Sequence, residues 1–274
     1  MPELRVILTI AGKEFRDRLR NRWVLVVALV FTALALTIAY FGNAQQGTLG
    51  FRSMAVTIAS LVSLVIYLIP LIALMLGFDA IVGERERGTL DLVLSLPLSR
   101  GELLIGKYCG LAAALSAATV AGFGAVGAVL LPVSTPADAL RFAGFVLSSV
   151  ALGCAFLSIA LMLSTFARDR ARASGLAIGA WFFFVLVFDL LLLGGLVATS
   201  GQASGDLIAW ALLANPADVF RILNVLAVEE IRSLHGLVSI FPAAYTRPAV
   251  LIAAMLAWIV LPLAVAHRRF RTST

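Results

Sequence analysis

Six long apolar runs constrain what this chain can fold into. A helix needs about 20 mostly apolar residues to cross a hydrocarbon core of roughly 30 Å. The composition agrees with a membrane location, since 61% of the 274 residues are hydrophobic, 13% are charged, and the mean hydropathy is +1.03. We predict an all-α, polytopic membrane protein with a single transmembrane domain over residues 1–274. Its six transmembrane helices are expected at about 23–42, 54–78, 106–133, 139–166, 173–199 and 248–267.

The Lys and Arg residues predict the orientation of these spans. Of the 21 basic residues, 16 lie in the N-terminus, the second and fourth connecting segments and the C-terminus, and five lie in the other connecting segments. Because cytoplasmic segments of membrane proteins are rich in Lys and Arg, both termini are expected in the cytoplasm. Basic residues at these places also contact anionic lipid. The net charge of +6 therefore needs no nucleic-acid partner to explain it.

The N-terminal residues 2–20 have the pattern of an amphipathic helix. Apolar residues recur at steps of three and four, and basic residues occupy the opposite face. The apolar stripe comprises Leu4, Ile7, Leu8, Ala11, Phe15 and Leu19. We expect a helix that lies on the membrane surface. A cytosolic helix that packs on a partner is the alternative, because the same face would suit either surface.

The segment of residues 83–100, GERERGTLDLVLSLPLSR, separates the second and third spans. The charge bias places it in the cytoplasm. Thr89 is expected to cap a short helix that Pro97 ends, and the helix carries the apolar residues Leu90, Leu92, Val93, Leu94 and Leu96. Long apolar runs flank this 83–100 segment on both sides, so it has no local structure to fold against. We therefore expect it to bind a partner.

Capping signals mark where two of the spanning helices begin. Ser99 and Glu102 stand three residues apart, which is the capping-box spacing. Thr135 and Asp138 repeat this spacing, with a proline at the first helical position. These signals predict helix starts immediately before the third and fourth spans.

Two further connecting segments have a predicted structure. Residues 166–173, FARDRARA, form a tight cytoplasmic turn that is a second candidate contact surface. The outer segment, residues 200–247, is expected to hold two short helices in or on the outer leaflet. The second of these helices is expected to begin after a cap at Asn215 and to continue to about Arg232.

Several glycine patterns resemble nucleotide-binding motifs. Residues 101–108, GELLIGKY, match the glycine and lysine spacing of a phosphate-binding loop. Tyr108 stands where a magnesium-binding Ser or Thr is required, and the pattern opens a membrane helix instead of following a buried strand. We therefore assign no nucleotide site to this chain. Glycines four residues apart are better explained as close-packing positions between membrane helices, and the pairs are Gly106 with Gly110 and Gly175 with Gly179.

Two acidic residues fall within or beside predicted spans. Ionisable groups at membrane depth are costly and are usually functional. Asp189 either pairs with a polar partner across a helix interface or lines a substrate path, and the sequence does not decide between these roles. Asp79 lies near the cytoplasmic end of its span, where its carboxylate can reach water.

The sequence lacks the patterns of an intramembrane enzyme or a metal site. His235 and His267 lie outside the spans or at an end, and the sequence has no His-x-x-x-His pair. The soft potential copper ligands are scattered singly, as in core packing; they are Met54, Met75, Met162, Met255, Cys109 and Cys154. We expect no catalytic residue, no metal site and no bound cofactor in this chain.

The stretch GERERGTLDLVLSLPLSRGELLIGKY resembles the signature that follows the second span in ABC-2 type permeases. The matching positions are Gly83-Glu84, Gly88-Thr89, Pro97 and Gly106-Lys107. The resemblance extends over nearly the whole chain. It includes the N-terminal surface helix, the six spans, and Asn215-Pro216 and Arg221 in the outer segment.

This resemblance implies a non-catalytic permease subunit in a bacterial inner membrane. It implies a homodimer of permease chains and two separate cytoplasmic ATPase subunits, which bind the ATP and magnesium. Within the family, the chain most resembles permeases that serve maturation of the copper sites of nitrous oxide reductase. That narrower resemblance implies copper or sulfur supply and a periplasmic copper-binding partner. An exporter of lipid, drug or ion and a passive membrane anchor for a periplasmic assembly factor are the alternatives.

The resemblance also assigns roles to residues. Apolar side chains of the 83–100 segment would fill a groove of the ATPase, and charged ones would form the rim of the contact. The apolar set is Leu90, Leu92, Val93 and Leu96, the charged set is Glu84, Arg85, Glu86, Arg87, Asp91 and Arg100, and Thr89 and Pro97 complete the coupling segment. A second cytoplasmic contact would be formed by Arg168, Asp169, Arg170 and Arg172. A solvated loop is the alternative for both charged sets.

Overall fold

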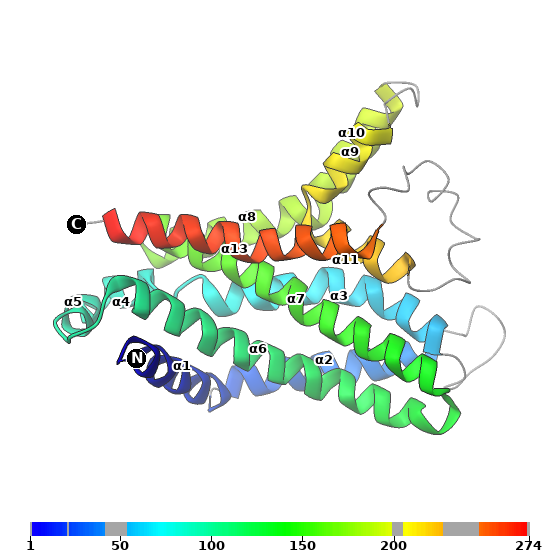
Figure 1. Cartoon of the computed structure of the whole chain (residues 1–274), viewed down its shortest axis with the longest axis horizontal. Coiled ribbons are helices and arrows are strands. Elements are labelled where there is room, and N and C mark those ends of the chain that lie inside the picture. Colours follow the sequence, from blue (N-terminus) through cyan, green and yellow to red (C-terminus); the bar gives the residue numbers. More distant parts are fainter. Residues whose placement is uncertain (1, 21, 42–53, 199–204, 227–246, 273–274) are drawn as a thin grey trace.

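The computed structural model of the chain describes residues 2–20, 22–41, 54–198, 205–226 and 247–272 (Figure 1). Within these ranges the chain is a bundle of helices without strands, which confirms the all-α prediction. The first helices are α1 (Pro2–Leu19), α2 (Arg22–Phe41), α3 (Met54–Gly77), α4 (Val82–Glu86), α5 (Thr89–Leu94), α6 (Arg100–Leu130) and the 3-10 turn η2 (Leu131–Val133). They are followed by α7 (Pro136–Phe166), α8 (Arg170–Phe182), η3 (Phe183–Val187), α9 (Phe188–Ala198), α10 (Gly205–Leu213), α11 (Pro216–Leu226) and α13 (Pro248–Thr272).

Five helical stretches in the described ranges are long and apolar enough to cross a membrane. They coincide with the second to sixth predicted spans and run over Val56–Glu86, Arg100–Leu130, Pro136–Phe166, Arg170–Ala198 and Pro248–Thr272. The first predicted span coincides with α2, in which the described apolar stretch, Ala28–Phe41, is shorter. A polytopic membrane protein is thus confirmed. The helices α1, α4 and α5 and the last turns of α13 lie at one end of the bundle, called the terminal end below (Figure 1).

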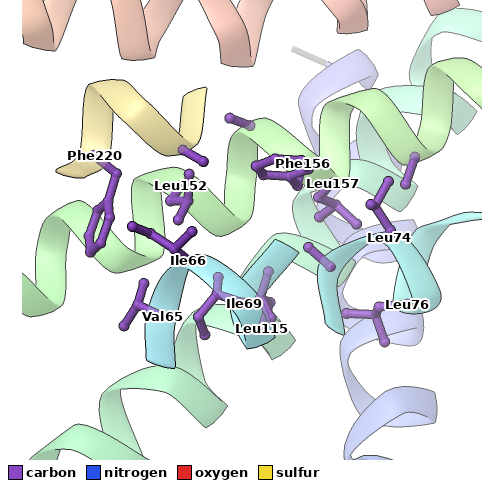
Figure 2. Close-up of a cluster of buried hydrophobic side chains, with 14 of the residues drawn as sticks. Val65, Ile66, Ile69, Leu74, Leu76, Leu115, Leu152, Phe156, Leu157 and Phe220 are labelled. Carbon is purple, nitrogen blue, oxygen red and sulfur yellow. The ribbon is translucent and has the colours of Figure 1, made fainter. Parts of the chain in front are cut away.

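The core of the bundle is built around α7, which contacts α3, α6, α11 and α13. Figure 2 shows labelled apolar side chains of α3, α6, α7 and α11 gathered in this core. Ile66 of α3 and Leu115 of α6 meet Leu152 and Phe156 of α7, and Phe220 of α11 closes the cluster. All five side chains are buried. Because α11 contributes to this cluster, the second outer helix belongs to the packed body of the bundle.

The N-terminal helix α1 packs along the first half of α6. A Cβ atom at Gly106 would lie 2.8 Å from the Cβ of Ile10, and one at Gly110 would lie 2.6 Å from the carbonyl oxygen of Ala11. Only glycine therefore permits this approach of the two helices. The pair is thus a close-packing position, as predicted, but its partner is the N-terminal helix α1 and not one of the predicted spans. The predicted surface helix thus lies against its own chain, although Leu4 of its apolar stripe stays exposed.

The predicted capping boxes are both present. The hydroxyl of Ser99 accepts a hydrogen bond from the Glu102 amide at 3.2 Å, and Glu102 accepts from the Ser99 amide at 2.6 Å. Thr135 and Asp138 form the same reciprocal pair at the start of α7. These bonds satisfy amide groups that a helix start leaves without partners.

Other local predictions are wrong. Gly88, with a φ of 69°, is the N-cap of α5, and Thr89 is its first residue. The chain reverses between α4 and α5 through a left-handed residue, a conformation that glycine adopts without steric cost. The helix also ends at Leu94, before the predicted boundary at Pro97.

The second predicted glycine pair has no packing partner among the described residues. A Cβ atom at Gly175 or Gly179 would meet nothing within 4 Å of them, so the close-packing role of this pair stays a prediction.

The fifth predicted span contains a π-helical turn, η3, between α8 and α9. Such turns widen the helix and often mark functional sites. Beyond the turn, α9 and α10 project away from the body of the bundle (Figure 1), and α9 buries none of its side chains. The two short helices expected in the outer segment correspond to α10 and α11 of the structure. The predicted continuation of the second one to about Arg232 lies outside the described residues.

Candidate functional site

The 83–100 segment is attached to the bundle by hydrogen bonds to α7. The hydroxyl oxygen of Ser164 accepts hydrogen bonds from the backbone N–H groups of Ile81 and Val82, each at 3.1 Å, and all three residues are buried. These two amides lie at the start of α4, where helix N–H groups have no partner in their own helix. Ser164 therefore supplies the missing acceptor and determines where α4 begins.

A buried ion cluster joins the 83–100 segment to α1 and α6. The Nζ atom of Lys107 lies 2.6 Å from Oε1 of Glu14 on α1 and 2.7 Å from Oε1 of Glu84 on α4. The Lys107 side chain is 5% exposed. These lengths are those of charge-assisted hydrogen bonds. We call Lys107, Glu14 and Glu84 the Lys107 cluster, which ties three helices together at the terminal end.

The turn between α7 and α8 contacts the same segment. The guanidinium group of Arg170 donates to Oδ2 of Asp79 at 2.9 Å, and its backbone N–H donates to Oε1 of Glu86 at 3.2 Å. Arg85 donates to the carbonyl oxygen of Ala167 at 3.2 Å. The two cytoplasmic contact surfaces predicted from the sequence therefore lie side by side and form one surface.

The remaining charged residues at this turn have different surroundings. Asp169 caps α8, because its carboxylate accepts a hydrogen bond from the Arg172 amide at 2.7 Å. Arg168 is exposed. Asp79, which was expected to reach water, also pairs with Arg18 of α1 at 3.7 Å. The turn is thus connected to α1 as well as to α4.

Only part of the predicted apolar contact set faces outward. Leu92 on α5 and Leu96 after it are 73% and 57% exposed. Leu90 is 7% exposed and belongs to the core of the chain itself, and Val93 is half-buried against that core. The exposed neighbours of the two leucines are Glu86, Arg87, Thr89, Asp91 and Pro97. The surface open to a partner is therefore formed by Leu92, Leu96 and these neighbours, without Leu90.

Arg100 connects the end of the 83–100 segment to α13. Its guanidinium group donates to the carbonyl oxygen of Phe270 at 3.0 Å and lies 5.9 Å from the centre of the Phe270 ring. A cavity of about 310 Å³ lies where α6 begins and α13 ends, and it is lined by Ser99, Arg100, Gly101, His267 and Arg271. Arg100 is thus anchored within the chain.

A second ion cluster lies far from the terminal end, between α9 and α11. The guanidinium group of Arg221 donates to Oδ2 of Asp189 at 2.9 Å and to Oδ1 of Asp189 at 3.4 Å. It also donates to Oδ1 of Asp218, one helical turn earlier on α11. We call Arg221, Asp189 and Asp218 the Arg221 cluster. Asp189 therefore has a polar partner across a helix interface, which is one of its two predicted roles.

Asp218 is the fully buried member of the Arg221 cluster. Burial raises the pKa of its carboxyl group to about 6, although the nearby Arg221 guanidinium acts in the opposite direction. The buried amide of Asn215 donates to Oδ2 of Asp218 at 2.8 Å. It also donates to the carbonyl oxygen of Phe184, in the π-helical turn, at 2.9 Å. The start of α11 is thus hydrogen-bonded to the preceding span.

Sequence reasoning named Lys107, Glu84, Asp189 and Arg221 without pairing them, and it missed Glu14 and Asp218 as their partners. Lys107 was noticed as part of a pattern that resembles a phosphate-binding loop and as part of the ABC-2 signature. A lysine in an apolar helix is costly unless it is paired, and that signal could have predicted a carboxylate partner. The polar residues of α11 recur at every third position, as Asn215, Asp218, Arg221 and Asn224. That ridge predicts a helix with a polar contact, but the sequence does not say with which helix.

The soft potential copper ligands belong to several helices, since Met54 and Met75 lie on α3, Cys109 on α6, Cys154 and Met162 on α7, and Met255 on α13. Met54 and Met255 are buried in the apolar core, and Cys109 and Cys154 are free thiols. In the described ranges, no group of three or more His, Cys, Asp or Glu side chains is placed to hold a metal ion.

Comparisons with known proteins agree with this architecture. Residues 8–273 match the family described as ABC-2 family transporter protein. The chain is 44% identical over 270 residues to the probable ABC transporter permease protein NosY of Pseudomonas aeruginosa, covering 97% of this chain and 98% of that protein. It is 45% identical over 269 residues to the protein of the same name from Stutzerimonas stutzeri, again covering 97% of this chain and 98% of the relative. The chain therefore belongs to the ABC-2 family of transporter proteins and is a permease subunit of an ABC transporter.

Proposed function

We propose that this permease subunit couples ATP hydrolysis by separate cytoplasmic ATPase subunits to a task on the outer side of the membrane. The observation that carries the proposal is the exposed pair Leu92 and Leu96, on a segment that is otherwise firmly attached to the bundle. Large apolar side chains surrounded by charged ones are typical of a protein contact. The subunit itself contains no catalytic residue, and ATP and magnesium are held by its partner.

The attachment of this surface makes it suitable for transmitting motion. Ser164 fixes α4 to α7, the Lys107 cluster fixes α4 to α1 and α6, and Arg170 fixes it to α8. A displacement of the 83–100 segment by an ATPase would therefore reach four helices. The bias of Lys and Arg supports a cytoplasmic position for this end, in a bacterial inner membrane.

The functional unit is a homodimer of this chain with two ATPase subunits. Gly175 and Gly179 support this proposal, because they have the close-packing spacing of membrane helix pairs but contact no described helix of their own chain. A second copy of the chain would supply the missing partner helix.

The task on the outer side is the supply of copper or sulfur for maturation of nitrous oxide reductase. The identity of 44–45% to two proteins named NosY supports this choice. A copper-binding protein in the periplasm would bind the outer segment of residues 200–247. There are two alternatives, which the experiments below test. One is export of a lipid, drug or ion, and the other is passive anchoring of a periplasmic assembly factor.

Copurification tests the ATPase contact. The tagged chain is purified in detergent from cells that make its native partners, and copurifying ATPases are identified by their phosphate-binding motifs and by ATP hydrolysis. Combined Leu92→Asp and Leu96→Asp substitutions are expected to remove the ATPase, because two charges would have to be buried in the contact. Leu131→Asp, at an exposed leucine between α6 and α7, is the matched control and retains it. Copurification that survives the double substitution contradicts the proposal.

Reconstitution distinguishes the possible tasks. Complexes in vesicles are supplied with ATP, and the movement of copper, sulfur species and lipid is measured separately. ATP-dependent movement of copper or a sulfur species supports the proposed task, and movement of lipid supports an exporter. A complex that hydrolyses ATP without moving any of them supports mechanical action on a periplasmic partner, and a chain without any ATPase is a passive anchor.

A further inference from the structure

The described contacts connect α11 to the fifth span within its π-helical turn and just after it. Asn215 donates to the carbonyl oxygen of Phe184, which lies within the turn, at 2.9 Å. Arg221 donates to Asp189, the second residue of α9, at 2.9 Å. A π-helical turn interrupts the regular hydrogen-bond ladder and leaves backbone groups available to outside partners. The two contacts therefore hold the place where the span changes direction.

The two helices joined by these contacts differ in how firmly they are packed. The side chains of Val219 and Phe220 on α11 are fully buried, and α11 contacts α3, α7 and α13. By contrast, α9 buries none of its side chains and leaves the body of the bundle (Figure 1). The polar contacts of Asn215 and Arg221 thus lie at the base of α9, where the span leaves the packed body.

The chemistry of the Arg221 cluster suits a contact that can open. The guanidinium group is planar and can bridge two carboxylates at once. Asp218 is fully buried and keeps Arg221 on α11, whereas the side chains of Arg221 and Asp189 are 38% and 39% exposed. Loss of the Asp189 contact would leave Asp189 and Arg221 partly hydrated and the buried Asp218 still paired. The contact to α9 is therefore the one that opens at least cost.

We propose that Arg221 is a positioning residue that clamps α9 to α11 and so sets the direction in which the outer half of the fifth span leaves the bundle. The proposal rests on the proposed function for its role in the transport cycle, in which α9 moves between defined positions. Without the clamp, α9 would no longer hold a defined position relative to the bundle.

Spin-label distances test this proposal in the full chain, with Cys109 and Cys154 replaced by Ala. Labels at Leu193 on α9 and Leu140 on α7, both exposed, report the position of α9. The wild-type distribution is expected to be narrow without nucleotide and to shift to a second narrow peak when the ATPase complex is trapped with ADP and vanadate. Arg221→Gln is expected to broaden the distribution and to abolish the discrete shift, while the complex still binds its ATPase.

Three controls separate a clamp from a general loss of structure. Asp189→Ala leaves the buried Asp218 paired with Arg221, and it is expected to reproduce the broadening even if Arg221→Gln does not fold. Arg141→Gln removes an arginine whose ion pair in the described residues is with Asp138 of its own helix, and it is expected to change nothing. Labels at Leu140 of α7 and at the exposed Ile252 of α13 are expected to keep the wild-type distance distribution in every variant.

Two outcomes overturn the proposal. One is an unchanged distance between α7 and α9 in both Arg221→Gln and Asp189→Ala. The other is equal broadening between α7 and α13, which would make Arg221 a general support of the fold. Failure of an ATPase to copurify contradicts the proposed function instead, and the measurement without nucleotide still decides whether the clamp exists.

Discussion

The two ion clusters of this permease join helices in different ways. In the Lys107 cluster, a side chain that is 5% exposed bonds to carboxylates on two other helices. The close approach of α1 to α6 at Gly106 and Gly110 encloses it. In the Arg221 cluster, the arginine is 38% exposed and bonds across to a helix that buries no side chain. The comparison indicates a rigid block where an ATPase would bind and a looser, polar joint where the outer helices begin.

The largest expected effect on stability comes from removing the positive charge at the centre of the Lys107 cluster. Lys107→Met leaves the largely buried Glu84 without its counter-ion and leaves Glu14 with the more distant Arg18, at 3.9 Å. Removing one partner of a buried pair costs about 3–5 kcal/mol. We expect little folded protein, measured as the monodisperse fraction after detergent purification. Adding Glu14→Gln and Glu84→Gln to this variant removes the stranded charges and should restore folding. A stable single variant would contradict the rigid-block description.

A smaller effect is expected from separating α1 from α6. Gly110→Ala places a methyl group 2.6 Å from the carbonyl oxygen of Ala11, so α1 must shift. Overpacking of this kind costs about 1–3 kcal/mol, seen as a lower melting temperature in detergent. Gly124→Ala is the matched control, because a Cβ atom there meets nothing within 4 Å. Equal melting temperatures for the two variants would show that α1 is not part of the block.

Removing the hydrogen bonds that attach α4 to α7 is expected to lower stability by less. Ser164→Ala removes the acceptor of two buried amides, and each lost hydrogen bond costs about 1 kcal/mol. We expect faster hydrogen exchange at Ile81 and Val82 and weaker binding of the ATPase. Ser95→Ala, at an exposed serine whose hydroxyl donates to the carbonyl oxygen of Leu92, is the control. Unchanged exchange at the two amides would mean that Ser164 does not position the 83–100 segment.

The smallest expected effect is the pH dependence of the Arg221 cluster. The pKa of Asp218 is raised to about 6 by burial, above its usual value of about 3.9 in an unfolded chain. The folded state therefore binds this proton more tightly, and the stability that Asp218 contributes is fully present below about pH 4 and is lost as the pH rises to about 6. The melting temperature of wild type relative to Asp218→Asn should fall over this range. A difference in melting temperature between the two proteins that stays constant over this pH range would contradict the prediction for Asp218.

The exposed surface of the 83–100 segment was only partly predictable from sequence. The apolar and charged residue types predicted a contact, and Leu92 and Leu96 are indeed exposed. Leu90 lies two residues before Leu92 and has the same chemistry, but it belongs to the core. Residues two apart on a helix point to nearly opposite sides, and the direction of α5 after the left-handed Gly88 decides which of the two leucines faces the core. That conformation depends on where α4 is anchored, which residues close in sequence do not specify.

The sequence by itself determined the features that depend on nearby residues. The lengths of the apolar runs predicted the spanning helices, because each span must satisfy its own backbone hydrogen bonds in lipid. The caps at Ser99 and Thr135 followed from residues three positions apart. Only the tertiary structure decided the pairing of charges, since Lys107 meets Glu14 and Arg221 meets Asp189 across long sequence separations. Lipid-facing and core-facing side chains are equally apolar in a membrane protein, so periodicity could not reveal which helix faces meet.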